Sequence, residues 1–160
     1  MNTADIFAPV STADDYAPAL TAGYYAHATT AGSDSHAATT GYRAYALTAG
    51  DEADATTAGS YSHALTAGDY AHATTVGRLA HALTAGARAK TSATGENSIA
   101  VAVGANSYAR AANGGFIVLA QYDGDTVVAV KTAQVGKDGI KPDTWYKLSP
   151  TGEFIEAEVG

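Results

Sequence analysis

The sequence predicts an all-β protein: a parallel β-solenoid of nine-residue strand-turn units, about two per coil, followed by a small C-terminal β domain. Three observations predict it. A nine-residue period runs through residues 2–109, small and large side chains alternate within each period, and the composition becomes that of an ordinary β protein after residue 115. Ala, Thr and Gly make up almost half of the 160 residues, far more than in an ordinary globular domain.

The nine-residue period is clearest in segments 20–28 and 65–73, which share the pattern Leu-Thr-Ala-Gly-x-Tyr-Ala-His-Ala. Extended in both directions, the period gives twelve units. The fourth place of each unit is Gly, except in the first two units, where it is Asp5 and Asp14. Gly and Asp are among the residues that tolerate a left-handed backbone, so we expect each unit to turn at its fourth place.

Side chains alternate in size along the second half of each unit. The seventh and ninth places hold small residues, mostly Ala, whereas the sixth and eighth places commonly hold Tyr, Asp, Arg, His or Lys. A period of two is typical of a half-buried strand, so the small side chains should face inward and the larger ones outward. The same alternation points the second-place Thr inward. One strand and one turn cannot bury a face alone, so the units must stack into a solenoid.

The first place of the unit indicates two strands per coil. From Leu47 as far as Val101 it alternates between an aliphatic residue and Thr or Ser, so the full repeat is eighteen residues and twelve units make six coils. Leu20, Thr29 and Ala38 depart from this alternation. An interior of Ala, Ser and Thr requires the two sheets to lie closer together than the usual ~10 Å.

Domain boundaries follow the end of the period. The solenoid is assigned to residues 2–109, a linker containing Asn113-Gly-Gly115 to residues 110–115, and a small β-sheet cap domain to residues 116–160. Alternating apolar runs and turn residues predict a hairpin and two further strands in the cap. These segments are 116–122, 126–130, 145–148 and 153–158.

Polar and aromatic side chains that should face solvent form a candidate surface for binding a protein partner. All five His fall at the eighth place of their units, four Tyr fall at the sixth place, and most acidic residues of the solenoid lie in its first half. The candidate residues are Tyr16, Tyr25, Tyr61, Tyr70, His27, His36, His63, His72, His81, Asp34, Asp51, Glu52, Asp54 and Asp69. Exposed Tyr is typical of interfaces, although Tyr also favours strands and the other side chains could equally be ordinary solvated residues.

An eighteen-residue coil makes His63 and His81 direct neighbours, about 4.8 Å apart along the stack. Two protonated imidazoles at that distance repel each other, so we expect their titrations to be coupled. A metal site at these two His is possible, but zinc usually takes three or four ligands, so exposed ladder residues are the preferred interpretation. We expect neither a metal nor a cofactor.

The sequence also argues against several functions. It has no Cys, no phosphate-binding loop, no nucleophile elbow and no His-Glu-x-x-His motif, so we expect no enzymatic activity. The net charge of −7 disfavours direct nucleic-acid binding, whereas the acidic residues concentrated in residues 1–72 leave open a face that mimics DNA. No apolar run approaches the roughly 18 residues of a membrane span, and we expect no signal peptide or membrane anchor.

One stretch resembles the head repeats of trimeric autotransporter adhesins. It is the run Glu96-Asn-Ser-Ile-Ala-Val-Ala-Val-Gly-Ala-Asn-Ser107. The resemblance implies a β-roll and a structural or adhesive module, such as an adhesin head or a phage tail-fibre segment.

A second resemblance covers both parts of the chain. The Ala-Thr-Thr-Ala-Gly arrays, followed by Gly139-Ile-Lys-Pro-Asp-Thr-Trp-Tyr146, resemble small repeat proteins of phages and prophages. This resemblance implies a non-enzymatic, anti-CRISPR-like inhibitor that binds a host protein or protein complex in the host cytoplasm. Both kinds of module are compatible with a homodimer or a homotrimer.

Overall fold

The computed structural model describes residues 9–137 and 139–159, and every regular element in them is a β-strand, as the sequence predicts. Residues 2–8, which the period assigns to the first unit, lie outside the described residues. One sheet, sheet A, contains in spatial order β1 (Pro9–Thr12), β3 (His27–Thr30), β5 (Tyr45–Thr48), β7 (His63–Thr66), β9 (His81–Thr84), β11 (Ile99–Ala102), β13 (Phe116–Asp123) and β14 (Thr126–Gln134). The other, sheet B, contains β2 (Pro18–Ala22), β4 (His36–Thr40), β6 (Asp54–Ala58), β8 (His72–Thr75), β10 (Lys90–Ala93), β12 (Tyr108–Ala111), β15 (Tyr146–Leu148) and β16 (Phe154–Glu156).

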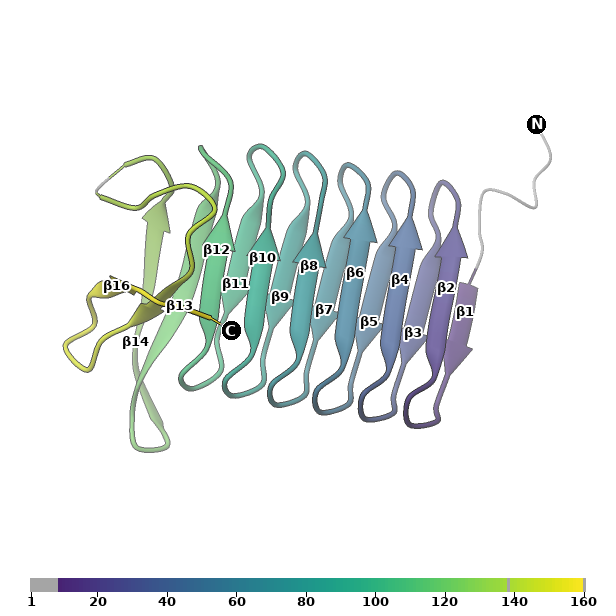
Figure 1. Cartoon of the computed structure of the whole chain (residues 1–160), viewed down its shortest axis with the longest axis horizontal. Coiled ribbons are helices and arrows are strands. Elements are labelled where there is room, and N and C mark those ends of the chain that lie inside the picture. Colours follow the sequence, from purple (N-terminus) through teal and green to yellow (C-terminus); the bar gives the residue numbers. More distant parts are fainter. Residues whose placement is uncertain (1–8, 138, 160) are drawn as a thin grey trace.

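Each coil of the solenoid consists of one strand of sheet A, one strand of sheet B and two turns (Figure 1). Strands of successive coils pair in parallel with an eighteen-residue register, so that Ala46 lies between Ala28 and Ala64. The same register places Leu20 opposite Ala38 and Thr29 opposite Leu47. Leu20, Thr29 and Ala38 therefore depart from the first-place alternation only in residue type. The eighteen-residue pairing of the strands is unbroken at these positions.

The interior consists of columns of small side chains. The ninth-place Ala and second-place Thr are buried, as the alternation predicts, among them Ala64, Ala73 and Thr75. Where Thr91 occupies a ninth place, its Oγ1 lies 2.8 Å from Oγ1 of Thr84, and Ala93 replaces the Thr of the next second place. The Ala and the Thr of the usual pattern thus exchange places on this strand. Because each buried methyl contributes only about 0.8 kcal/mol, the hydrogen-bond ladders, summed over the coils, must supply most of the stability.

The turn geometry corrects the expectation for the fourth place. The left-handed residue is at the sixth place, where φ lies between 53° and 59° in ten turns, while among the fourth-place glycines only Gly23 and Gly41 have positive φ. Gly is needed at the fourth place for a different reason, because a Cβ at Gly68 would overlap the carbonyl oxygen of Gly50 in the preceding coil. Asp14 belongs to the first described coil, where no earlier described coil presents such an oxygen.

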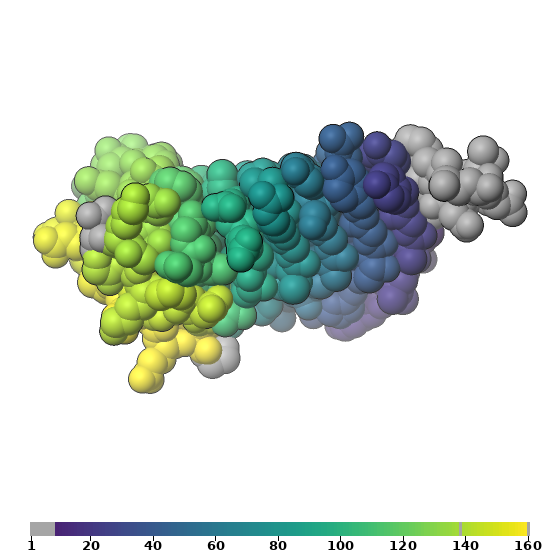
Figure 2. Space-filling view, turned by 90° about the horizontal axis from the view of Figure 1, so that it is seen from above, coloured from purple at the N-terminus to yellow at the C-terminus, as the bar shows by residue number. Residues whose placement is uncertain are grey.

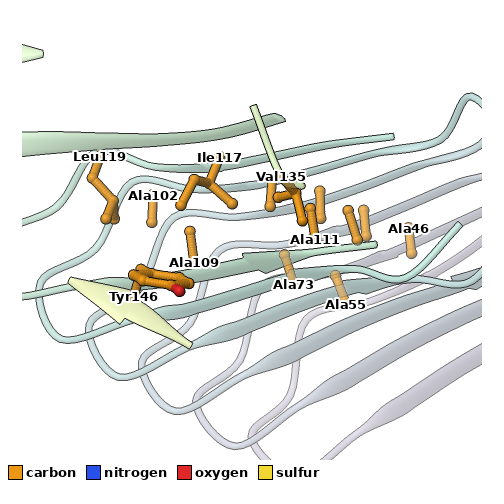
Figure 3. Packing of buried hydrophobic residues seen from close by; sticks show 14 of the residues in the cluster. Ala46, Ala55, Ala73, Ala102, Ala109, Ala111, Ile117, Leu119, Val135 and Tyr146 are labelled. Atoms are coloured by element: carbon orange, nitrogen blue, oxygen red, sulfur yellow. The ribbon is translucent and has the colours of Figure 1, made fainter. Parts of the chain in front are cut away.

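Residues 116–159 continue both sheets and close the C-terminal end of the stack, which is the broader end of an elongated molecule (Figure 2). β13 pairs in parallel with β11, and β14 returns antiparallel to β13 as the predicted hairpin. In sheet B, β15 pairs antiparallel with β12, and β16 pairs with β15. The large buried apolar side chains gather here, with Ile117, Leu119 and Tyr146 closing an interior that is otherwise lined by Ala, Thr and Ser (Figure 3).

Some of the buried Thr hydroxyls lack hydrogen-bond partners within the described part of the chain, among them that of Thr66. We expect Thr66→Val to raise the free energy of unfolding by about 1 kcal/mol, because valine keeps the shape of threonine and removes an unpaired polar group. Urea denaturation of the two proteins measures the difference.

Thr57→Val is the matched control, since the Thr57 hydroxyl lies 3.1 Å from the Ser62 hydroxyl and accepts a hydrogen bond from it. Losing that bond should offset the gain, leaving stability unchanged or lower by about 1 kcal/mol. Equal effects of the two substitutions would show that the Thr66 hydroxyl is not unpaired.

Candidate binding surfaces

The solenoid presents four surfaces: the outer faces of sheets A and B and two rows of turns. We call the first five turns from odd to even strands the acidic edge (residues 13–17, 31–35, 49–53, 67–71 and 85–89). The first five turns from even to odd strands are the tyrosine edge (residues 23–26, 41–44, 59–62, 76–80 and 94–98). Figure 1 shows the acidic edge as the lower row of turns and the tyrosine edge as the upper row.

The structure distributes the fourteen candidate residues over all four surfaces. Sheet A carries His27, His63 and His81; sheet B carries His36, Asp54 and His72; the acidic edge carries Tyr16, Asp34, Asp51, Glu52, Asp69 and Tyr70; and the tyrosine edge carries Tyr25 and Tyr61. Residues nine positions apart fall on opposite sides of the solenoid. The candidates therefore form four separate groups.

The outer face of sheet A carries a stack of aromatic rings in its eighth-place column. Ring centroids are 4.9 Å apart for His27 and Tyr45, 4.8 Å for Tyr45 and His63, and 5.2 Å for His63 and His81. Ile99 and Phe116 continue the column. His63 and His81 are neighbours, as the eighteen-residue coil predicts. Tyr45, which completes the stack, was not among the candidate residues, although its place in the same column was readable from the sequence.

A second, aliphatic column runs beside the aromatic stack. It consists of the first-place residues Leu47, Leu65, Leu83, Val101 and Val118. Leu47 is 43% exposed and Phe116, at the end of the neighbouring column, is 41% exposed. Among the outward-facing side chains of β1, β3, β5, β7, β9 and β11, and of residues 116–120, there is no Asp, Glu, Lys or Arg. Sheet A thus presents an apolar face without formal charge.

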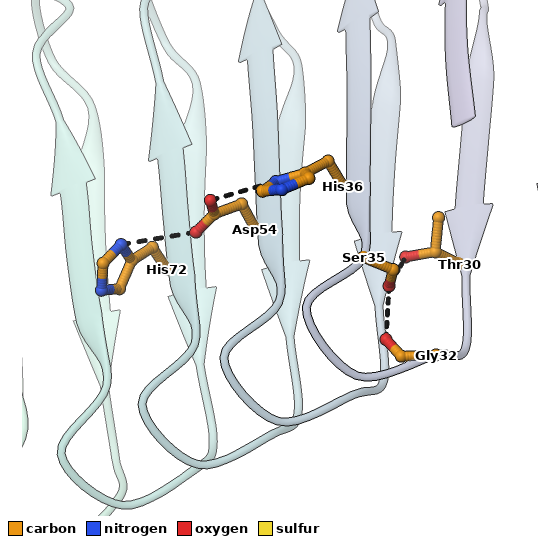
Figure 4. A network of polar contacts seen from close by, with 6 residues as sticks. All are labelled: Thr30, Gly32, Ser35, His36, Asp54 and His72. Atoms are coloured by element: carbon orange, nitrogen blue, oxygen red, sulfur yellow. Dashed lines mark hydrogen bonds and ion pairs between the residues drawn. The ribbon is translucent and has the colours of Figure 1, made fainter. Parts of the chain in front are cut away.

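The outer face of sheet B is polar in the same columns. The Asp54 carboxylate lies between two imidazoles, with Oδ2 3.1 Å from Nδ1 of His36 and Oδ1 3.4 Å from Nδ1 of His72 (Figure 4). Farther along the sheet, the Arg110 guanidinium donates to the Ser92 hydroxyl at 2.9 Å and lies over the Trp145 ring. No group of three or more His, Asp or Glu in the part of the chain that the structure describes is arranged to hold a metal ion.

The pKa values of two histidines are lowered. Partial burial lowers the pKa of His63, and the neighbouring His81 lowers it further. Partial burial also lowers the pKa of His72, where the Asp54 carboxylate opposes the effect and Lys90 adds to it. Both imidazoles are therefore held in the neutral form at neutral pH.

Acidification should destabilise the protein through these two histidines. Because folding lowers their pKa, the unfolded chain takes up protons more readily, so the free energy of unfolding should be constant above the ordinary pKa of 6.5 and fall as the pH drops below it toward the folded values. NMR titration should give His63 a midpoint below 6.5, and His81→Gln should raise that midpoint. A His63 midpoint that His81→Gln leaves in place would refute the coupling.

The acidic edge combines a structural role with exposed charge. The carboxylates of Asp15, Asp51 and Asp69 each accept a hydrogen bond from the backbone N–H eighteen residues later, at 2.8, 2.9 and 2.7 Å. Asp34 and Glu52 occupy the left-handed sixth place of their turns. Arg88 ends the acidic row, and its guanidinium donates to the Tyr70 hydroxyl. Some of these acidic residues thus satisfy backbone donors of the turns.

The tyrosine edge is aromatic and carries Arg. Ring centroids are 5.0 Å apart for Tyr24 and Tyr42 and 5.2 Å apart for Tyr42 and Tyr61. The Arg43 guanidinium lies 5.4 Å from the centroid of Tyr42 and donates to the Tyr25 hydroxyl at 3.5 Å. Cation–π and aromatic contacts therefore order this row of turns along the stack.

Comparisons with known proteins give no relative. None of the protein-family models, curated proteins or solved structures compared with the chain matches it. No helix in residues 9–137 or 139–159 is long and apolar enough to cross a membrane.

Proposed function

We propose that the protein is a non-enzymatic protein-binding module that docks through the outer face of sheet A. The observation that supports this is the charge-free apolar face, on which the aromatic stack from His27 to His81 runs beside the aliphatic column from Leu47 to Val118. Contiguous apolar surface bordered by polar residues is typical of protein interaction sites. Interfaces are also enriched in aromatic side chains and depleted of charge at their centre.

The shape of the face favours a protein as the partner. Small-molecule sites are concave and enclose most of the ligand, whereas the groove between the columns of sheet A, lined by Tyr45, Leu47 and Leu65 among others, is open to solvent. An open, ordered surface of this kind needs a partner that is itself broad. Side chains held in ladders lose little further conformational entropy on binding, which favours affinity.

The acidic edge favours a second function, inhibition of a host defence complex that binds nucleic acid. Six carboxylates occur in the four consecutive turns from residue 13 to residue 71, within about 20 Å at ~4.8 Å per coil. Duplex DNA carries one charge per ~1.7 Å, so the edge is a diluted electrostatic imitation of a duplex. This function agrees with the phage resemblance of the sequence.

A pull-down with matched variants tests both proposals. The tagged protein is immobilised and exposed to lysate of the cell that carries its gene, and the retained proteins are identified by mass spectrometry. Leu65→Lys places a charge at the centre of the sheet A face, and Thr74→Lys places the same charge at the equivalent position of sheet B. Docking through sheet A requires that only Leu65→Lys loses the retained proteins, and equal retention by both variants would overturn it.

The acidic edge is tested by a second pair of variants. Asp34→Asn with Glu52→Gln removes two edge charges that, within the described residues, accept no backbone hydrogen bond like those of Asp15, Asp51 and Asp69. Asp54→Asn removes a charge from sheet B. Inhibition through the edge requires that the first variant loses a nucleic-acid-binding complex that the second retains. Retention of that complex by both variants would discard this function.

A further inference from the structure

The charge-free face of sheet A has enough area for a specific dimer. Its seven strands at ~4.8 Å spacing extend over about 29 Å, and each four-residue strand is about 13 Å long. Including the side chains, the face covers on the order of 500 Å², so pairing two copies would bury at least about 1,000 Å² in total. Specific interfaces begin at about this size.

Two symmetric arrangements bring two copies of this face together. If the two-fold axis runs along the stack, the acidic edge of one copy lies beside the tyrosine edge of the other, coil by coil. If the axis instead runs along the strands, each acidic edge lies beside the other acidic edge, with the coils in opposite order. The distribution of charge over the two edges distinguishes these arrangements.

Charges on the two edges are complementary along the stack. On the acidic edge, carboxylates occupy the turns of the first four coils and Arg88 occupies the fifth. On the tyrosine edge, the charged residues are Arg43 in the second coil, Arg78 in the fourth and Glu96 in the fifth. The sign therefore reverses in the same coil on both edges.

This complementarity has no role within one molecule. Arg88 precedes β10 and Glu96 follows it, so the two side chains lie at opposite ends of that strand. Only a second copy whose stack runs in the same direction brings the fifth turn of one edge beside the fifth turn of the other. The opposite arrangement lays each edge beside the same edge of the other copy, so Arg88 of one copy does not meet Glu96 of the other.

We infer that the outer face of sheet A binds a second copy of this chain, in a parallel, in-register dimer whose two-fold axis runs along the stack. This inference rests on the proposed docking function of sheet A and names the partner. The apolar columns supply the buried centre of the interface, and the edges supply its charged rim. Rim charges select the arrangement more than they add affinity.

Cysteine crosslinking tests the arrangement, since the chain contains no Cys. Thr29→Cys and Val101→Cys lie in the first-place column of sheet A, in line with Leu47 and Leu83, near opposite ends of the stack. In the parallel dimer, each variant alone forms a crosslinked dimer with a short bismaleimide. In the opposite arrangement, neither does so alone and a mixture of the two does, which would overturn the parallel order. Thr74→Cys on sheet B is the control and should remain uncrosslinked.

Sedimentation tests the dimer itself. The unaltered chain should sediment as a dimer, Leu65→Lys should raise the dimer dissociation constant at least 100-fold, and Thr74→Lys should leave it unchanged. Circular dichroism confirms that both variants fold. An unaltered chain that sediments as a monomer overturns the inference. If Leu65→Lys still abolishes retention of partner proteins in the pull-down, the docking function of sheet A remains supported. A dimer that only Thr74→Lys disrupts overturns both.

Charge reversal tests the edges. Arg88→Glu and Glu96→Arg should each weaken the dimer about fivefold, a typical effect for exposed charge pairs that occur twice in a symmetric interface. The double variant should restore the original dissociation constant, because it exchanges the signs and keeps them complementary. Additive weakening in the double variant would overturn the parallel arrangement.

Discussion

Replacing Gly68 by Ala should lower the free energy of unfolding by about 3 kcal/mol or more, although it adds only one methyl group. The added Cβ would overlap the carbonyl oxygen of Gly50 and crowd the backbone of Asp51. These are backbone atoms of the preceding coil, held by the ladders of two sheets, so they cannot rotate away as a side chain would. The coils must separate locally, which breaks hydrogen bonds on both sides of the turn.

Gly124→Ala is the matched control for this prediction. Gly124 has a φ of 57° in the hairpin turn, and a Cβ there would meet nothing within 4 Å. Gly124→Ala should lower the free energy of unfolding by only about 1 kcal/mol, which is the cost of placing Ala in the left-handed region. Guanidinium denaturation of both variants measures the difference. A loss at Gly68 no larger than that at Gly124 would show that close stacking does not require Gly.

Replacing Ile117 by Ala should destabilise the protein by about 2–5 kcal/mol. Ile117 is fully buried in the cluster that also contains Leu119, Val135 and Tyr146 (Figure 3). Elsewhere the core consists of Ala, Thr and Ser, so this end contains the few large apolar side chains whose removal leaves a cavity. The neighbouring columns are held by their own ladders and cannot collapse to fill it.

Val118→Ala provides the comparison on the same strand. Val118 faces outward in sheet A and is only partly buried, so its truncation should cost less than about 1 kcal/mol. Chemical denaturation gives both values. Equal losses would mean that the C-terminal strands do not seal the interior around Ile117.

The solenoid was predictable because its interior has room only for small side chains. Ala and Thr recur where two sheets lie close together, and that steric rule appears directly in the sequence as a nine-residue period. The doubling to eighteen was readable for a different reason: the outward first places hold Leu47, Leu65 and Leu83 on sheet A and polar residues such as Thr74 on sheet B.

The left-handed turn residue was not predictable from residue type. The sixth place holds Tyr61 and Leu79 as well as Asn97 and Asn106, and Tyr and Leu give no sign of a positive φ. Gly marked the correct turn, but what it signals is the close approach of successive coils. Close approach of successive coils and a left-handed backbone within a turn both favour Gly, so one sequence does not distinguish them.

The grouping of the candidate surface was missed because residues of one type were treated together. Tyr61 and Tyr70 are nine residues apart and share the sixth place, yet they lie on opposite edges. Position within the eighteen-residue coil decides the surface, and residue type within the nine-residue unit does not. The aliphatic column of sheet A was visible in the sequence as the alternation that revealed the coil, and its outward direction gives it a possible use in binding.

Because successive coils pair with an eighteen-residue register, the length of an insertion decides which surface the later side chains occupy. An insertion of eighteen residues lengthens the stack by about 4.8 Å and leaves every later side chain on its own surface. An insertion of nine residues preserves each local strand and turn but exchanges the two faces for everything that follows, moving charges onto the apolar side. The first-place Leu lies on sheet B at Leu20 and on sheet A at Leu47. A nine-residue duplication between these two positions would produce this change of sheet.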